Sequence, residues 1–158
     1  MARRIDFHDD PAAPTPTVIV PSVNVAVFND AGDLLLIRRS DNGNWALPGG
    51  GVDIGESLPQ AGVRETREES GIDCEITGLA GIYTDPGHVI LYTSNGEVRQ
   101  EFSVVLIARA TGGQLAGSSE TSEARWVPRA EIAGFQIDRS MLLRVEQVLQ
   151  QREQPFIG

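Results

Sequence analysis

The sequence predicts an α/β/α sandwich, in which a central mixed β-sheet is covered by one helix from the middle of the chain and one from its end. Three observations carry this prediction. Apolar runs and alternations typical of strands lie on both sides of the segment 57–71. That segment has helix signals at both ends, and the segment 138–152 repeats apolar residues at helical spacing. We therefore expect one α/β domain over residues 18–158.

The first 17 residues differ in composition from the rest of the chain. They are polar, contain prolines at positions 11, 14 and 16, and show no periodicity. Such a composition buries little apolar surface, which predicts a flexible or extended arm over residues 1–17 rather than part of the domain.

The next elements are predicted to be strands. Alternating valines at 23, 25 and 27, turn residues at 29–33 and the apolar run 34–37 predict a β-hairpin. Residues 45–47 then predict a short strand, which Pro48 and three glycines end abruptly.

A helix follows this glycine-rich turn. Ser57 can cap its first turn, and Gln60 three positions later completes a capping box. Pro59 is tolerated at this end, and Gly71 suits the left-handed position that closes a helix.

More strands are expected after the helix. Residues 74–83 and 89–93 predict two of them, and 94–97 form a two-residue hairpin signal before a long strand over 98–110. A loop rich in Gly and Ser over 111–122 leads into a strand at 124–127, and the segments 128–133 and 138 to about 152 are predicted to be helical. Cys74, the single cysteine, is expected to be a small buried hydrophobe.

Size and charge restrict the class of protein. With 158 residues, 41% of them hydrophobic, the chain can bury a core as one domain. A formal net charge of −9 argues against polymeric nucleic acid as a partner, since nucleic-acid binders gather Lys and Arg. No apolar run approaches the roughly 18 residues needed to cross a bilayer, and the N-terminus lacks a signal-peptide pattern. We expect a cytoplasmic protein with no membrane partner.

The central helix concentrates negative charge. Glu65, Glu68 and Glu69 stand at positions i, i+3 and i+4, so their side chains share one face. Their repulsion costs only about 0.2–0.5 kcal/mol per pair, and a bound divalent cation would turn it into attraction. Mg²⁺ prefers such hard oxygen ligands. The alternative is a solvated face on which Arg64 pairs with Glu68, and Arg67 neutralises the rest.

The turn before the helix adds a second feature. Glu56 stands just ahead of the helix, and the run 48–51 brings bare backbone close to it. Backbone carbonyls can coordinate a metal ion and backbone amides can meet phosphate.

Together these residues resemble the Nudix signature, which is Gly, five residues, Glu, seven residues, Arg-Glu, an apolar residue, any residue, Glu-Glu, any residue, Gly and an apolar residue. The matching positions are Gly50, Glu56, Arg64, Glu65, Thr66, Glu68, Glu69, Gly71 and Ile72. Only Thr66 departs, being polar where a hydrophobe is usual. The segments 45–48 and 123–127 also look similar to the flanks of Nudix domains.

The resemblance implies the Nudix fold and a metal-dependent hydrolase that uses Mg²⁺, with Mn²⁺ as a substitute. In such enzymes the metal is held by the carbonyl before the signature glycine and by the two adjacent glutamates, which are here Gly49, Glu68 and Glu69. Arg64 would orient these ligands, with Glu56 as its partner. Many members of the family dimerise, so a homodimer is also implied.

Two carboxylates compete for the role of general base. Cutting a diphosphate requires a water to attack one phosphorus while a carboxylate accepts its proton. The resemblance favours Glu65, which could instead be a further metal ligand, ahead of Glu120 in the glycine-rich loop. Glu123 is retained as an extra ligand.

The substrate is less well defined. We expect a small nucleotide-like diphosphate, and Pro86 resembles a proline of family members that hydrolyse ADP-ribose, which slightly favours ADP-ribose or a nucleotide sugar. A turn at 85–87 explains this proline equally well. The candidate substrate contacts are Tyr83, His88, Arg99 and Phe102.

Three rival functions remain open. The nearest is a house-cleaning nucleoside triphosphate pyrophosphohydrolase. A non-catalytic nucleotide-binding domain would usually have lost a metal glutamate, and an isomerase of the isopentenyl diphosphate type would need a suitably placed cysteine, for which Cys74 looks badly placed.

Overall fold

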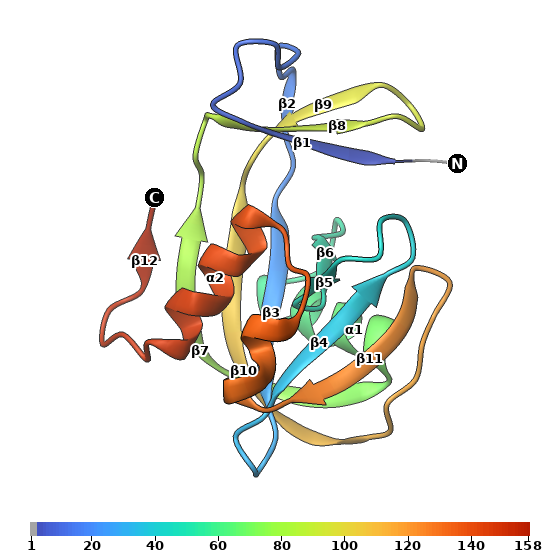
Figure 1. Ribbon diagram of the computed structural model, residues 1–158, viewed down its shortest axis with the longest axis vertical. Coiled ribbons are helices and arrows are strands. Elements are labelled where there is room, and N and C mark those ends of the chain that lie inside the picture. The colour runs from blue at the N-terminus through green and yellow to red at the C-terminus, as the bar shows by residue number, and fades with distance from the viewer. Residues whose placement is uncertain (1–2) are drawn as a thin grey trace.

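The computed structural model describes residues 3–158, which form two β-sheets and two α-helices (Figure 1). The strands are β1 Arg4–His8, β2 Val18–Ile19, β3 Ser22–Phe28, β4 Leu34–Arg39, β5 Trp45–Ala46, β6 Gly49–Gly51, β7 Ile72–Tyr83, β8 His88–Tyr92, β9 Glu97–Gln100, β10 Ser103–Gly113, β11 Thr121–Val127 and β12 Phe156–Ile157. The α-helices are α1 Leu58–Ser70 and α2 Arg139–Leu149, and a 3₁₀-helix spans Arg129–Gly134.

The larger sheet is the centre of a sandwich. Its main path runs β11-β4-β3-β10-β7-β12, with β5 on β4 and β6 on β3. The sheet is mixed, because β10 is parallel to β3 and antiparallel to β7. Helix α1 lies behind it and α2 lies in front (Figure 1). The predicted α/β/α sandwich around a mixed sheet is therefore confirmed.

Each face of this sheet has its own hydrophobic core. Val23 and Val25 of β3 pack with Ala61 of α1 on one face, whereas Leu36 of β4 packs with Val145 of α2 on the other. Alternate residues of a strand point to opposite faces, so both faces of a central strand can be apolar. Burial of each such side chain stabilises the fold by roughly 1.5–3 kcal/mol, which fixes the helices on the sheet.

Helix α1 begins and ends as its sequence predicts. The Ser57 hydroxyl accepts a hydrogen bond from the backbone N–H of Gln60, whose side chain in turn accepts one from the backbone of Ser57. Gly71 closes the helix in the left-handed region, with a φ of 77°. Defined ends place the glutamates of this helix at fixed heights beside the sheet.

The expected long strand over 98–110 is two strands in different sheets. β9 pairs with β8 and β2, whereas β10 pairs with β3 and β7, and the chain changes sheets at Glu101 and Phe102. The β-forming pattern continues across this point, so the sequence does not reveal the change of partner. The break matters for the site because it turns Glu101 inward, where it is 3% exposed.

The prediction of a flexible arm over residues 1–17 is wrong for residues 4–8. They form β1, which pairs antiparallel with β8 from Arg4 opposite Tyr92 to His8 opposite His88. This pairing joins segments about 80 residues apart, so a local pattern could not predict it. The smaller sheet, β1-β8-β9-β2, stands above the larger one in Figure 1. Residues 1 and 2 of the predicted arm lie outside the described residues.

Some boundaries shift slightly. The predicted helix at 128–133 is a 3₁₀-helix, α2 ends at Leu149, and β10 extends three residues into the expected loop. The short strand β12 has no predicted counterpart. Over residues 3–158, neither helix has the length and apolar character that crossing a membrane requires.

Candidate active site

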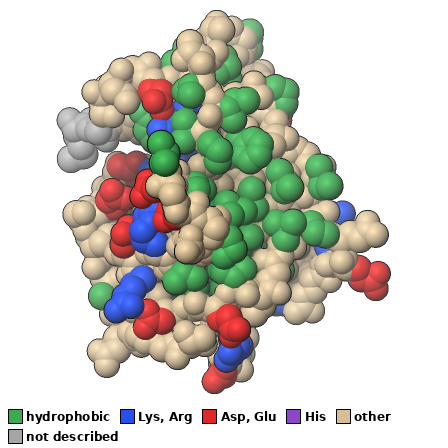
Figure 2. All heavy atoms as spheres, turned by 180° about the vertical axis from the view of Figure 1, so that it is seen from behind, with side chains coloured by type: hydrophobic (Ala, Val, Ile, Leu, Met, Phe, Trp, Pro, Cys, Tyr) green, Lys and Arg blue, Asp and Glu red, His purple; other side chains and the backbone are tan. Residues whose placement is uncertain are grey.

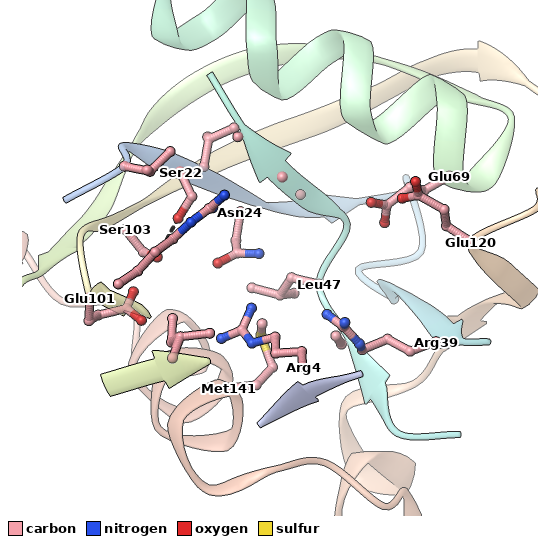
Figure 3. Close-up of a pocket in the computed structure, with 18 of the residues that line it drawn as sticks. Arg4, Ser22, Asn24, Arg39, Leu47, Glu69, Glu101, Ser103, Glu120 and Met141 are labelled. Atoms are coloured by element: carbon pink, nitrogen blue, oxygen red, sulfur yellow. Dashed lines mark hydrogen bonds between the residues drawn. The ribbon is translucent and has the colours of Figure 1, made fainter. Parts of the chain in front are cut away.

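A cleft of about 640 Å³ opens beside the glycine-rich turn of β6. Figure 3 shows Glu69 and Glu120 at one end of it, and Ser22, Glu101 and Ser103 toward the other. Apolar side chains, among them Leu47 and Met141, also line the cleft, and its two ends carry different polar groups.

Glu69 is a buried carboxylate at the end of the cleft. Its residue is 8% exposed. Burial, together with the charges of Glu65 and Glu120, raises the pKa of Glu69 to about 8, although a hydrogen bond from the backbone of Gly49 and the charge of Arg39 oppose the rise. A carboxylate in this setting favours a partner of positive charge, either a proton or a cation.

Glu65 lies one helical turn before Glu69, and its side chain is 13% exposed. Its Oε1 would lie 2.5 Å from a Cβ built on Gly50, so the glycine of the signature leaves room for this carboxylate. Burial raises the pKa of Glu65, the hydrogen bond from Arg64 lowers it, and the charges of Glu68 and Glu120 raise it.

Arg64 joins the turn to the helix. Its guanidinium donates to both oxygens of Glu56, at 3.0 Å and 2.6 Å, and to Glu65 at 2.8 Å and Glu68 at 3.2 Å. It also donates to the carbonyl of Gly51 at 3.2 Å. The hydrogen bonds from Arg64, together with one from the backbone of Asp53, lower the pKa of Glu56 to about 2. The predicted pairing of Arg64 with Glu56 is present, and it fixes two carboxylates relative to each other.

Of the remaining predicted site glutamates, only Glu120 lines the cleft. The side chain of Glu68 is 60% exposed and does not line the cleft, and it accepts a hydrogen bond from Arg64. Glu120 lines the cleft beside Glu69 (Figure 3). Glu123 does not line the cleft, because it pairs with Arg125 along β11.

Thr66, the departure from the signature, is fully buried in α1. Its hydroxyl donates to the carbonyl of Gly62 at 2.8 Å, one turn earlier in the same helix. The polar group is thus satisfied inside the helix without drawing on the site.

Two of the four predicted substrate contacts lie in the cleft. Arg99 and Phe102 line it, with the guanidinium of Arg99 lying 4.4 Å from the centre of the Tyr92 ring. Tyr83 and His88 line a second cavity of about 650 Å³ instead. Tyr83 donates to Gln147 there, and the buried His88 lies between two carboxylates.

Several residues of the cleft escaped sequence reasoning. Arg144 is 4% exposed and donates to Asn24 at 2.8 Å and to Glu101 at 2.7 Å. It lies on the face of α2 that carries the buried Met141 and Val145. A charged residue among apolar residues at helical spacing was the signal in the sequence that could have identified Arg144 as a cleft residue. Further cleft residues of this kind are Arg4, Ser22, Arg39 and Ser103.

The donor set suits a hard cation that needs few protein ligands. Among residues 3–158, no three His, Cys, Asp or Glu side chains form a ready-made cation cage. Mg²⁺ does not require one, because it commonly takes one or two carboxylates and fills its other positions with water and phosphate. Glu69 at the end of the cleft, with Glu65 and Glu120 close enough to affect its pKa, meets that demand.

The carboxylates at one end of the cleft and the arginines along its side suit the binding of a metal ion and of phosphate, as in the class of hydrolases that cut phosphate anhydrides. The particular family follows from comparison, since the NUDIX domain model matches residues 18–145 and the chain belongs to this family. It is a MutT-like Nudix hydrolase that acts on diphosphate bonds, and the family generally uses divalent metals.

Relatives of known name carry different activities. A MutT-like protein of Streptomyces ambofaciens is 36% identical over 77% of this chain and 71% of its own length. An ADP-ribose pyrophosphatase of Methanocaldococcus jannaschii is 31% identical over 78% of this chain and 72% of its own length. A human 8-oxo-dGDP phosphatase is 32% identical over 84% of this chain but only 40% of its own length. These names do not agree on one substrate.

Solved structures agree on the fold. An ADP-ribose pyrophosphatase from Streptococcus suis superimposes with a TM-score of 0.65, covering 89% of this chain and all of that one, at 20% identity. A NUDIX hydrolase from Nitrosomonas europaea gives 0.66 over 94% of this chain and 84% of its own, at 24% identity.

Proposed function

We propose that this chain uses Mg²⁺, or Mn²⁺ in its place, to hydrolyse a diphosphate linkage in a nucleoside diphosphate derivative. The observation that carries the proposal is the buried Glu69 at the end of the cleft, with Glu65 and Glu120 close enough to raise its pKa. Nothing in folding calls for three carboxylates at one place, whereas a divalent cation would stabilise them.

The metal ligands proposed are Glu69, Glu68 and the carbonyl of Gly49, with Glu65 as a further ligand if it is not the base. Glu68 is proposed on the resemblance, because its exposed side chain accepts a hydrogen bond from Arg64 outside the cleft. When bound, the cation would lower the pKa of a water and draw charge from the phosphate oxygens. Glu123 is the weakest of the proposed ligands, because it points to Arg125.

The chain itself supplies the proton acceptor and its positioning. Glu65 is the first candidate for the base, since it lies next to Glu69 and Arg64 holds one of its oxygens at 2.8 Å. Glu120 is the second, and it lines the cleft beside Glu69. Arg64 orients Glu65 relative to Glu56 and contacts no substrate in this scheme.

The substrate class follows from the cleft more than from Pro86. The proline on which the preference for ADP-ribose or a nucleotide sugar rests lines the second cavity, away from Glu69. The cleft accepts either a nucleotide sugar or a nucleoside triphosphate in size, and the named relatives include an ADP-ribose pyrophosphatase and an 8-oxo-dGDP phosphatase.

A non-catalytic nucleotide-binding domain and an isomerase both lack support. The signature keeps every glutamate that a non-catalytic domain would usually have lost. Cys74 is 8% exposed on β7 and does not line the cleft, so an isomerase would have no cysteine there.

The proposal is tested by incubating the purified chain with ADP-ribose, nucleotide sugars, dinucleoside polyphosphates and nucleoside triphosphates. Turnover should require Mg²⁺ or Mn²⁺ and stop with a chelator. Glu69→Gln should lower kcat by about a hundredfold or more with an unchanged Tm. Glu75→Gln, which removes an exposed carboxylate paired with Arg109, should keep kcat within about twofold. Normal turnover by Glu69→Gln, or none by the unaltered chain on any of these compounds, would overturn the proposal.

We also propose a homodimer, as the family resemblance implies. Figure 2 shows hydrophobic side chains gathered over much of the face seen from behind, a surface that a second subunit would cover. Light scattering on a sizing column measures the mass directly, and a mass near 17.0 kDa would exclude the dimer.

A further inference from the structure

Three arginines from three strands line one cleft in a chain of net charge −9. They are Arg4 of β1, Arg39 of β4 and Arg99 of β9. Arg4 lies outside the segment 18–145 that matches the family model. Its presence in the cleft is therefore a feature that the signature does not explain.

Arg4 and Arg39 are held in the same way. Arg4 donates through Nε and Nη2 to Asp6, at 3.0 Å and 2.8 Å. Arg39 donates through Nε and Nη2 to Asp41, at 2.9 Å and 2.6 Å. Each carboxylate fixes one edge of its guanidinium, and within residues 3–158 neither Nη1 donates to another group. Each guanidinium thus keeps both N–H donors of Nη1 and the second one of Nη2 for a ligand.

Arg39 and Arg4 line the same cleft as Glu69. The hydrogen bond to Asp41 raises the pKa of Arg39, while burial and the charge of Arg4 oppose the rise. Figure 3 shows Arg39 on the side toward Glu69, and Arg4 beyond it beside Met141. Two like charges so close repel, and an anion between them would remove the repulsion.

A buried chain of polar groups holds Arg4 in place. Asp6, which accepts from Arg4, lies 2.7 Å from Nε2 of His88. Nδ1 of His88 lies 3.0 Å from Glu101, which accepts from Arg144 of α2 at 2.7 Å. His88 and Glu101 are each 3% exposed. The strand that carries Arg4 is thereby tied to the far side of the cleft.

We propose that Arg4 and Arg39 form an anion subsite that takes a third phosphate group, next to the diphosphate cut at Glu69. This inference rests on the proposed function and specifies the substrate as a nucleoside polyphosphate with at least three phosphates. Two forks of N–H donors match the oxygens of a phosphate, and charge-assisted hydrogen bonds of this kind are about twice as strong as neutral ones. ADP-ribose and nucleotide sugars place an uncharged sugar at this point, so the N–H donors that Asp6 and Asp41 leave free would meet no phosphate.

Arg4→Gln tests the subsite, with Arg3→Gln as the matched control. Arg3 is the neighbouring arginine, is exposed and does not line the cleft. Arg4→Gln should raise KM for a nucleoside triphosphate by about tenfold and change KM for ADP-ribose by less than about twofold. Arg3→Gln should leave both values within about twofold, and Arg4→Lys should recover part of the loss because it restores charge without the fork.

A second measurement needs no variant. At a fixed concentration of free Mg²⁺, inorganic triphosphate should inhibit the unaltered enzyme at about tenfold lower concentration than inorganic pyrophosphate, because only the triphosphate reaches both the cation and the arginines. Equal inhibition by the two anions would overturn the subsite, and so would an Arg4→Gln variant that folds and loses both substrates equally.

Failure of the subsite differs from failure of the proposed function. If the unaltered chain hydrolyses ADP-ribose but no triphosphate, the diphosphatase activity stands and the subsite is wrong. If it hydrolyses no compound with Mg²⁺ present, the proposed function itself is wrong.

Discussion

The two ends of the cleft are built in different ways. The carboxylate end comes mainly from one continuous segment, from Gly49 to Glu69, which folds as a turn and a helix. The opposite end is assembled from β1, β3, β9, β10 and α2, which lie far apart in the sequence. The charges also differ in their pairing, because within residues 3–158 Glu69 has no cationic partner in hydrogen-bond contact, whereas Glu101 is paired with Arg144 and His88. One end gathers the carboxylates proposed to hold the metal ion, and the other ties α2 to the sheets through buried ion pairs.

The largest effect is expected at the carboxylate end. Glu65→Gln should lower the single-turnover rate by about 10²–10⁴-fold, the usual contribution of a general base, and should not lower stability because it relieves repulsion among the glutamates. Glu120→Gln should slow the reaction by a smaller factor. Both rates are measured by rapid quench at saturating Mg²⁺. A larger loss for Glu120→Gln would transfer the role of base to the loop.

At the opposite end of the cleft, a substitution should mainly lower the free energy of unfolding. Glu101→Gln leaves Arg144 and His88 buried without their carboxylate, which typically costs about 3–5 kcal/mol of unfolding free energy. Glu75→Gln breaks the exposed pair with Arg109 and should cost at most about 1 kcal/mol. Urea unfolding measures both. Similar values for the two variants would show that the buried chain does not hold the cleft, and the contrast between its ends would fail.

A smaller effect is expected in the pH dependence of stability. Burial lowers the pKa of His88, but hydrogen bonds to Asp6 and Glu101 outweigh it, so the folded pKa is raised above 6.5. The protonated histidine therefore stabilises the fold fully below about pH 6.5, and this stabilisation is lost as pH rises through the folded pKa. The gap in unfolding free energy between the unaltered chain and His88→Gln should be widest near about pH 5.5 and shrink as the pH rises through the raised pKa.

His8 provides the control for this experiment, because its ring lies 4.4 Å from that of His88. Burial and the charge of His88 lower the pKa of His8, so its protonation opposes folding. The variant His8→Gln should therefore gain stability relative to the unaltered chain as pH falls. A gap for His88→Gln that stays constant with pH would mean that the histidine is not charged between its carboxylates.

The same contrast explains how much the sequence could predict. The caps of α1, its shared face of glutamates and the pairing of Arg64 with Glu56 all depend on residues close together in the chain, so fixed spacing predicts them. The small sheet depends on pairing between β1 and β8, and the break at Glu101 depends on which strands flank it. Neither is encoded locally. Arg4 and Arg144 were missed because their places in the cleft come from tertiary contacts.

The ladder between β1 and β8 has a further consequence. Side chains alternate along a strand, so Arg4 and Asp6 share one face while Ile5 and Phe7 share the other. A slip of one residue against β8 would turn every side chain of β1 over and replace the arginine in the cleft by an aliphatic group. The alignment of five residues with their partners thus decides which side chain of β1 lines the cleft. Insertions or deletions in the connection 9–17 could alter substrate preference while every glutamate stays in place.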